Sequence, residues 1–149
     1  MQKPLNLSSL CFLLLAYANQ LIAHDIVSVV SQVKPSIVGV GTHDPLSAPR
    51  NVIKGTGFVI GDGTLIATNF HVVDASIDKL KSQSWVVFAG SGRNSKVIKV
   101  DIVAFDEIHD LAILKMSEKL SPLPLANSEF IPDGTDVAFT GYPLSLIHI

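Results

Sequence analysis

The spacing of hydrophobic positions changes along the first 35 residues of the chain. An uninterrupted apolar run occupies residues 10–18, after the single cation Lys3 and a polar spacer. Beyond Asp25 the apolar residues recur at intervals of three, one and three, the period of an amphipathic helix. The members of this stripe are Ile26, Val29, Val30 and Val33. We therefore expect a short N-terminal helix over residues 24–35, with Asp25 as its N-cap and Pro35 as its end.

From residue 37 onward the pattern becomes one of short apolar segments, rich in β-branched residues and separated by glycine and proline. The Gly-Asp-Gly turn at 61–63 predicts a hairpin, because these residues tolerate the left-handed backbone of tight turns. The segments expected to form strands are 37–40, 56–60, 64–68, 85–89, 96–105, 111–114 and 137–140. Residues 42–54 are expected to form an exposed loop, and the wholly apolar segment 111–114 a strand buried on both faces. Several short strands with turns between them predict an all-β fold, either a sandwich or a barrel.

The N-terminal apolar run has the features of a secretory signal peptide. A cation precedes the run over 10–18, and small residues suited to cleavage lie at Ala16, Ala18 and Ala23. The run is too short to cross a bilayer, which takes about 20 apolar residues. We expect residues 1–23 to be removed during export, giving a periplasmic or secreted protein with no membrane span in its mature form. The alternative interpretation is an N-terminal core helix.

Composition narrows the classes of function further. The formal net charge is −2, so the chain lacks the basic excess that binds nucleic acid, and no nucleic-acid partner is expected. Its only cysteine, Cys11, lies in the expected signal, which leaves the mature protein without a disulfide or a thiolate nucleophile. The histidines and acids show no His-x-x-x-His or Glu-x-x-His pair, so no metal site or other cofactor is expected.

Two residues stand at positions suited to chemistry. His71 follows shortly after the expected strand 64–68, and Asp110 opens the apolar segment 111–114. A carboxylate at the start of a buried strand needs a hydrogen-bonding partner, because an unpaired buried charge is very costly. Taken alone, His71 could be a loop histidine and Asp110 could bind the amides of a turn, so both alternatives stay open.

The surrounding motifs change the balance between these alternatives. In chain order they are 55–60 (Gly-Thr-Gly-Phe-Val-Ile), 61–63 (Gly-Asp-Gly), 65–73 (Leu-Ile-Ala-Thr-Asn-Phe-His-Val-Val), 109–115 (His-Asp-Leu-Ala-Ile-Leu-Lys) and 141–143 (Gly-Tyr-Pro). Together they resemble the HtrA/Deg family of trypsin-like serine proteases. The resemblance implies two β-barrels with an active site in the cleft between them, the first over 36–117 and the start of the second over 118–149.

The resemblance also implies roles for single residues and a class of substrate. His71 corresponds to the general base and acid of a catalytic triad, and Asp110 to the carboxylate that orients it. The substrates implied are polypeptides. Asp106 and Glu107 are expected to be solvated turn residues and His109 to be exposed. Nothing in the sequence indicates an oligomeric state.

The printed sequence contains no nucleophile for such a protease. The family carries its serine in a Gly-x-Ser-Gly-Gly segment downstream of the aspartate, and the chain has no such segment. Ser91 precedes Asp110, and Ser145 lies too near the end of the chain for an oxyanion-hole loop. The chain as written is therefore expected to lack peptidase activity. Residues 144–149 match the translation of a transposon end used as a sequencing adapter, which predicts that they are adapter-encoded.

The leading hypothesis is an exported serine endopeptidase, and two alternatives come from other classes. One is a non-catalytic module on the same scaffold that binds peptide segments by strand addition. A gene without a Gly-x-Ser-Gly motif would favour it. The other is a structural β-domain in which His71 and Asp110 never meet, which fails if the two side chains lie within hydrogen-bonding reach.

Overall fold

The computed structural model describes residues 26–74, 82–90, 95–126, 132–135 and 137–142. They fall into two units, 1–34 and 35–149. The expected signal peptide, Ser91 and residues 144–149 lie outside the described residues. In the first unit, residues 26–33 form an α-helix, within the range indicated by the apolar stripe. No helix in the described part of the chain is both long and apolar enough to cross a membrane.

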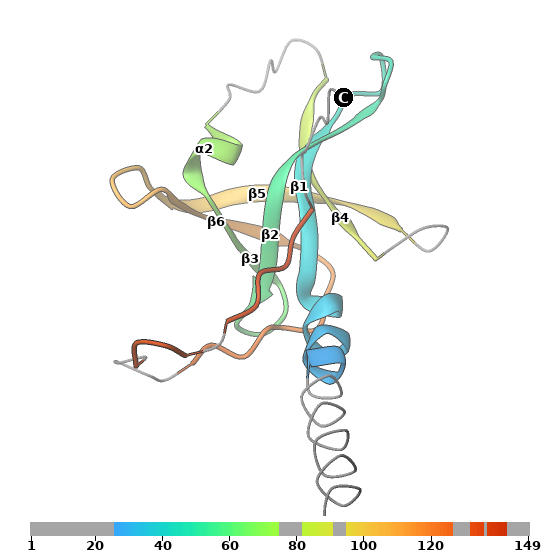
Figure 1. The fold of residues 1–149 in the computed structure, drawn as a ribbon. Helices are drawn as coiled ribbons and strands as arrows, with labels where there is room; N and C mark the ends of the chain where they lie inside the picture. Colours follow the sequence, from blue (N-terminus) through green and yellow to red (C-terminus); the bar gives the residue numbers. More distant parts are fainter. Residues whose placement is uncertain (1–25, 75–81, 91–94, 127–131, 136, 143–149) are drawn as a thin grey trace, which may run out of the picture. The chain divides into compact units, whose positions relative to one another are not determined.

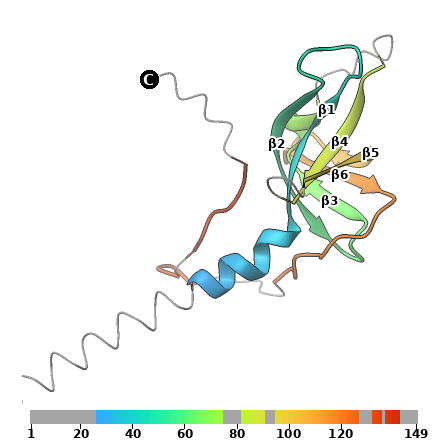
Figure 2. The ribbon, with the colours of Figure 1, turned by 90° about the vertical axis from the view of Figure 1, so that its right-hand side faces the viewer.

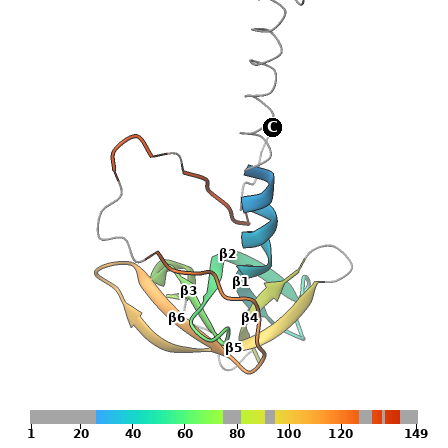
Figure 3. The ribbon, with the colours of Figure 1, turned by 90° about the horizontal axis from the view of Figure 1, so that it is seen from below.

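Six antiparallel strands of the second unit close into a barrel (Figure 1). The strands are β1 (Ile37–His43), β2 (Asn51–Ile60), β3 (Leu65–Thr68), β4 (Ser84–Ala89), β5 (Lys96–Asp106) and β6 (Leu111–Met116). Their order is β1-β2-β3-β6-β5-β4, and β1 closes the ring by pairing with both β2 and β4. A 3₁₀ turn, η1 (Lys34–Ser36), precedes β1, and a four-residue helix, α2 (Phe70–Val73), follows β3. The expected all-β fold with a complete first barrel is confirmed, and Figures 2 and 3 show the ring from two further sides.

The predicted hairpin at residues 61–63 joins β2 to β3. Gly61 and Gly63 have φ angles of 63° and 91°, which residues with a β-carbon rarely adopt. Between them, the carboxylate of Asp62 accepts hydrogen bonds from the hydroxyl of Thr64 at 2.6 Å and from its backbone N–H at 3.0 Å. These two bonds, the hydroxyl first, hold the pKa of the Asp62 carboxyl below its ordinary value. The turn therefore fixes the start of β3, the strand that leads to His71.

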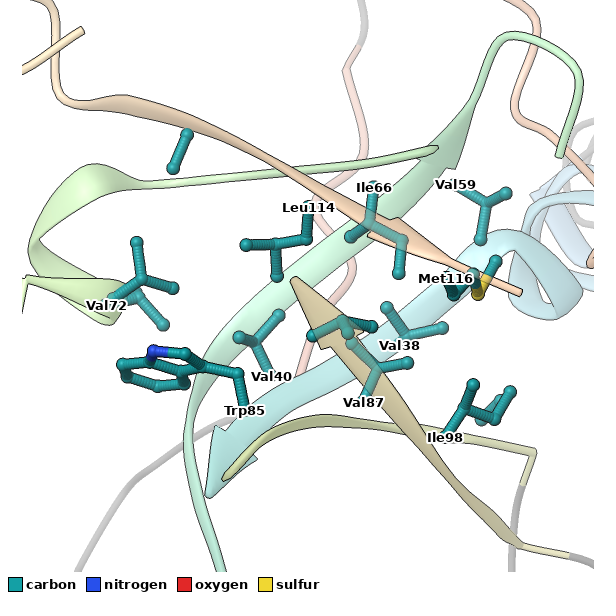
Figure 4. Packing of buried hydrophobic residues seen from close by; sticks show 14 residues of the cluster. Val38, Val40, Val59, Ile66, Val72, Trp85, Val87, Ile98, Leu114 and Met116 are labelled. Carbon is teal, nitrogen blue, oxygen red and sulfur yellow. The ribbon is translucent and has the colours of Figure 1, made fainter. Parts of the chain in front are cut away.

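The core fills the inside of the barrel with aliphatic side chains from all six strands. Those that are completely buried are Val38, Val40, Val59, Ile66, Val87 and Leu114 (Figure 4). Removing such apolar surface from water is the main favourable contribution to folding. Val72 and Val73 of α2 belong to the same cluster, so the short helix is anchored to the core.

The prediction of an exposed loop over 42–54 is wrong about where the loop begins and ends. β1 continues to His43 and β2 begins at Asn51, which leaves only 44–50 between them. The two strands keep pairing across an irregularity between Val40 and Gly41. The β-branched residues Thr42, Val52 and Ile53 at the two ends of the expected loop therefore belong to the ladder.

Two expectations about strands near the C-terminus are also wrong. β6 is buried on one face only: Ala112 and Leu114 are buried, whereas Leu111 is 52% exposed. A barrel strand has one face toward the core and one toward solvent, whatever the polarity of its residues. Residues 137–140 form no strand, because no strand of the described residues pairs with them.

Candidate active site

A short helical turn presents His71 to solvent. β3 leads into Asn69, whose backbone is extended (φ −78°, ψ 146°), and α2 follows at once. Val72 and Val73 are buried in the core and hold the helix in place. The side chain of His71, on the same turn, is 71% exposed. The histidine expected just past a strand therefore lies on an anchored helical turn.

Asp110 reaches the same region from the turn between β5 and β6. Thr68 of β3 pairs with Ala112 of β6, so the residues after β3 lie beside the residues before β6. Asp110 has a φ of 52°, in the left-handed region that aspartate and asparagine enter more readily than other L-residues. In Figure 1 this turn lies on the same side of the barrel as α2.

His71 and Asp110 are in direct contact. Nδ1 of His71 lies 2.7 Å from Oδ2 of Asp110, and the backbone N–H of His71 donates to Oδ1 at 2.9 Å. An ionised carboxylate only accepts hydrogen bonds, so Nδ1 carries the proton and Nε2 of the neutral ring is left as an acceptor. The alternative of a β-domain in which these two side chains never meet is therefore wrong.

Hydrogen bonds favour the ionised form of Asp110. The backbone N–H of His71 has the largest effect and lowers the pKa of this carboxyl below its ordinary value. Burial acts in the opposite direction, and the ring of His71 and the amide of Asn69 add to the lowering. The Asp110 carboxyl is therefore charged at neutral pH.

Asn69 is a member of this site that the sequence reasoning missed. Its side-chain Nδ2 donates to both the backbone carbonyl and Oδ2 of Asp110, each at 3.1 Å. In the sequence Asn69 belongs to the 65–73 motif quoted above, but nothing in that motif indicates contact with a residue 41 positions away.

A second histidine–carboxylate pair lies in the turn before Asp110. Nδ1 of His109 lies 2.7 Å from Oδ2 of Asp106, and the backbone N–H of His109 donates to Oδ1 at 3.1 Å. Both bonds come from His109, the ring contact having the larger effect, and they lower the pKa of the Asp106 carboxyl. His109 is 71% exposed, as expected, but Asp106 is paired rather than simply solvated. The Asp-x-x-His spacing within a turn is the signal that could have revealed this pair.

An apolar groove of about 590 Å³ adjoins α2. It is lined by Phe70, Val73, Asp74, Ile102, Val103, Ala104 and Phe105. Phe70 and Phe105 stack with their ring centroids 5.2 Å apart, which ties β5 to the helical turn. Neither His71 nor Asp110 lines the groove. Within the described ranges, no group of three or more histidines, cysteines or acids is placed to hold a metal ion.

Known proteins with similar sequences and structures define the class of this chain. Residues 55–146, which include both His71 and Asp110, match the family model described as a trypsin-like peptidase domain. Human serine protease HTRA4 is 35% identical over 128 residues, covering 81% of this chain and 25% of that protein. A "Probable periplasmic serine endoprotease DegP-like" of Halomonas elongata is 33% identical over 95 residues, covering 63% and 18%. The crystal structure of Deg5 has a TM-score of 0.56 and 25% identity, over 74% of this chain and 52% of that one.

The chain belongs to the trypsin-like peptidase family, and within it the chain is HtrA-like. It spans a quarter or less of the length of the two curated relatives named above.

Proposed function

We propose that this chain carries the general base and the orienting carboxylate of an exported serine endopeptidase acting on polypeptides. The observation that carries the proposal is the 2.7 Å contact between His71 Nδ1 and Asp110 Oδ2 on a trypsin-like scaffold. A histidine whose Nδ1–H is held by a carboxylate presents an unprotonated Nε2, the atom that a serine hydroxyl needs as its base.

In this proposal His71 moves the proton and Asp110 holds the ring. Nε2 of His71 takes the proton of the attacking serine hydroxyl and later returns it to the leaving amine. Asp110 fixes the tautomer and stabilises the imidazolium that forms, without itself becoming protonated. The backbone bond from His71 to Oδ1 supports this role, because it fixes the plane of the carboxylate relative to the ring.

The nucleophile of this proposal would come from residues outside the printed sequence. The chain has no Gly-x-Ser-Gly segment, and in this family the same segment supplies the amides of the oxyanion hole. We therefore propose that the 149-residue chain by itself does not hydrolyse peptide bonds.

Export is the second part of the proposal. A cation followed by a short apolar run supports a signal peptide over residues 1–23. The Halomonas relative is named as periplasmic, which agrees with export. N-terminal sequencing of the protein recovered from the periplasm of a bacterial host should give a start near His24. A chain that retains Lys3 contradicts this part.

A fluorophosphonate probe tests the catalytic part, because it reacts covalently with a serine that a neighbouring histidine activates. We expect the product of the complete gene to be labelled on one serine encoded downstream of Pro143. The label should disappear in His71→Ala and persist in His109→Ala. The second variant is a matched control, since His109 has the same 2.7 Å contact with a carboxylate but no proposed catalytic role.

The outcomes separate the proposal from its alternative. Label that depends on His71 supports the endopeptidase. A complete gene product that takes no label, with no Gly-x-Ser-Gly segment in its sequence, contradicts it and favours the non-catalytic peptide-binding module.

A further inference from the structure

Asn69 occupies the position of a helix N-cap but does not act as one. Asparagine is among the preferred N-cap residues because its side-chain oxygen accepts a bond from a backbone N–H of the first turn. At Asn69 this bond is absent, although the residue has the extended backbone of an N-cap. The side chain instead contacts Asp110. The side chain of Asn69 is therefore suited to capping α2 but bonds instead to Asp110, which is distant in sequence.

The contact with Asp110 allows only one orientation of the side-chain amide of Asn69. Both partner atoms, the backbone O and Oδ2 of Asp110, are acceptors when the carboxyl is ionised. The side-chain oxygen of Asn69 cannot bond to either of them, so the NH₂ group must face both. One group therefore holds the main chain and the side chain of Asp110 at the same time.

Asp110 needs such a restraint more than most residues. Its φ of 52° is unfavourable for a residue with a β-carbon, and its own turn supplies a single long bond, from its N–H to the carbonyl of Glu107 at 3.3 Å. The terminal torsion of an aspartate side chain is also broad. Apart from Asn69, the side-chain donor to this carboxylate in the described part of the chain is the ring of His71, and that ring is itself the group whose orientation must be fixed.

We propose that Asn69 is a positioning residue of the His71–Asp110 pair, one that keeps Oδ2 of Asp110 aligned with Nδ1 of His71. The inference rests on the proposed function, in which that alignment selects the tautomer of His71. Three donors bind the two oxygens of the carboxylate. The backbone N–H of His71 donates to Oδ1, and both the Asn69 amide and the His71 ring donate to Oδ2. The backbone N–H of His71 lowers the pKa of the Asp110 carboxyl most, and the Asn69 amide adds to the lowering, in agreement with this arrangement.

The test is ring ¹⁵N NMR of the 149-residue chain, which reports how the neutral His71 divides its proton between Nδ1 and Nε2. In the parent we expect the Nδ1–H tautomer and a protected Nδ1 proton. Asn69→Ala and Asn69→Ser should both lower the ratio of Nδ1–H to Nε2–H by about two- to tenfold, the weight of one hydrogen bond. Serine is itself a good N-cap, so this variant keeps the start of α2 while losing the reach to Asp110.

Asn51→Ala is the matched control. It removes an asparagine that contacts a different histidine, through Oδ1 of Asn51 and Nδ1 of His43 at 2.7 Å, and should change the signals of His43 alone. A parent with the Nδ1–H tautomer and unchanged His71 signals in both Asn69 variants overturns the role of Asn69 only. A parent without that tautomer contradicts the His71–Asp110 pair, and with it both this inference and the proposed function.

Discussion

Gly55→Ala tests how the barrel wall determines the position of His71. A β-carbon added to Gly55 would meet Cγ2 and Cγ1 of Val72 at 2.5 and 2.8 Å. Favourable carbon–carbon contacts begin at about 3.5 Å, so the two groups must separate by about 1 Å. Val72 is buried and β-branched, with little rotamer freedom, so we expect α2 itself to move. The 2.7 Å bond from the adjacent His71 to Asp110 does not survive a displacement of that size.

The stability lost in Gly55→Ala and the change in the His71–Asp110 contact can be measured separately. Overpacking of a well-packed core costs about 1–3 kcal/mol, and at a urea dependence of about 2 kcal/mol/M the unfolding midpoint should fall by about 1 M. Fluorescence of Trp85, the single tryptophan and a member of the core, follows the unfolding. Ring ¹⁵N NMR at a urea concentration of zero should show loss of the Nδ1–H state of His71.

Two further variants test whether the clash between residue 55 and Val72 is what displaces His71. In Gly39→Ala the added β-carbon would have its nearest neighbours at 3.5 Å, an ordinary contact, so neither readout should change appreciably. Adding Val72→Ala to Gly55→Ala removes both clashing methyl groups and should restore the His71 signal. A Gly55→Ala variant with the parental midpoint and an intact Nδ1–H signal would refute the reasoning.

Two other predictions concern stability. Leu114→Ala, at a completely buried position, should lower the free energy of unfolding in urea by about 2–5 kcal/mol, whereas Leu111→Ala on the same strand should cost less than about 1 kcal/mol; equal losses would contradict the one-sided burial of β6. Because folding lowers the pKa of Asp110, its contribution to stability is present above the unfolded pKa of about 3.9 and disappears as the pH falls through the lower folded value. The unfolding free energy of the parent should therefore fall more steeply below about pH 5 than that of Asp110→Asn, and parallel curves would contradict the pairing.

Local residue chemistry made some elements predictable from the sequence. The turn at 61–63 follows from two glycines around an aspartate, and the helix over 26–33 from its apolar spacing. The limits of the loop at 44–50 were not predictable, because they depend on how far β1 and β2 stay paired. The pairing of β3 with β6 likewise joins residues distant in sequence, and composition does not encode it.

In the candidate site, too, local features were predictable from the sequence and contacts between distant residues were not. Motif resemblance indicates His71 and Asp110, but their contact depends on the β3–β6 register and on the left-handed backbone of Asp110, which only the fold supplies. The contact made by Asn69 was not predictable, because its side chain bonds to a partner on another element and not to the helix that follows it. The pair of Asp106 and His109 was within reach, since its members lie three residues apart in one turn.

The rate of polypeptide hydrolysis by the complete gene product tests most directly the proposal that Asp110 orients His71 for catalysis. We predict that Asp110→Asn lowers kcat by about 10⁴-fold, the loss known for this substitution in the trypsin triad, while Asp106→Asn leaves kcat within a few-fold of the parent. An Asp110→Asn enzyme as active as the Asp106→Asn control would contradict the account.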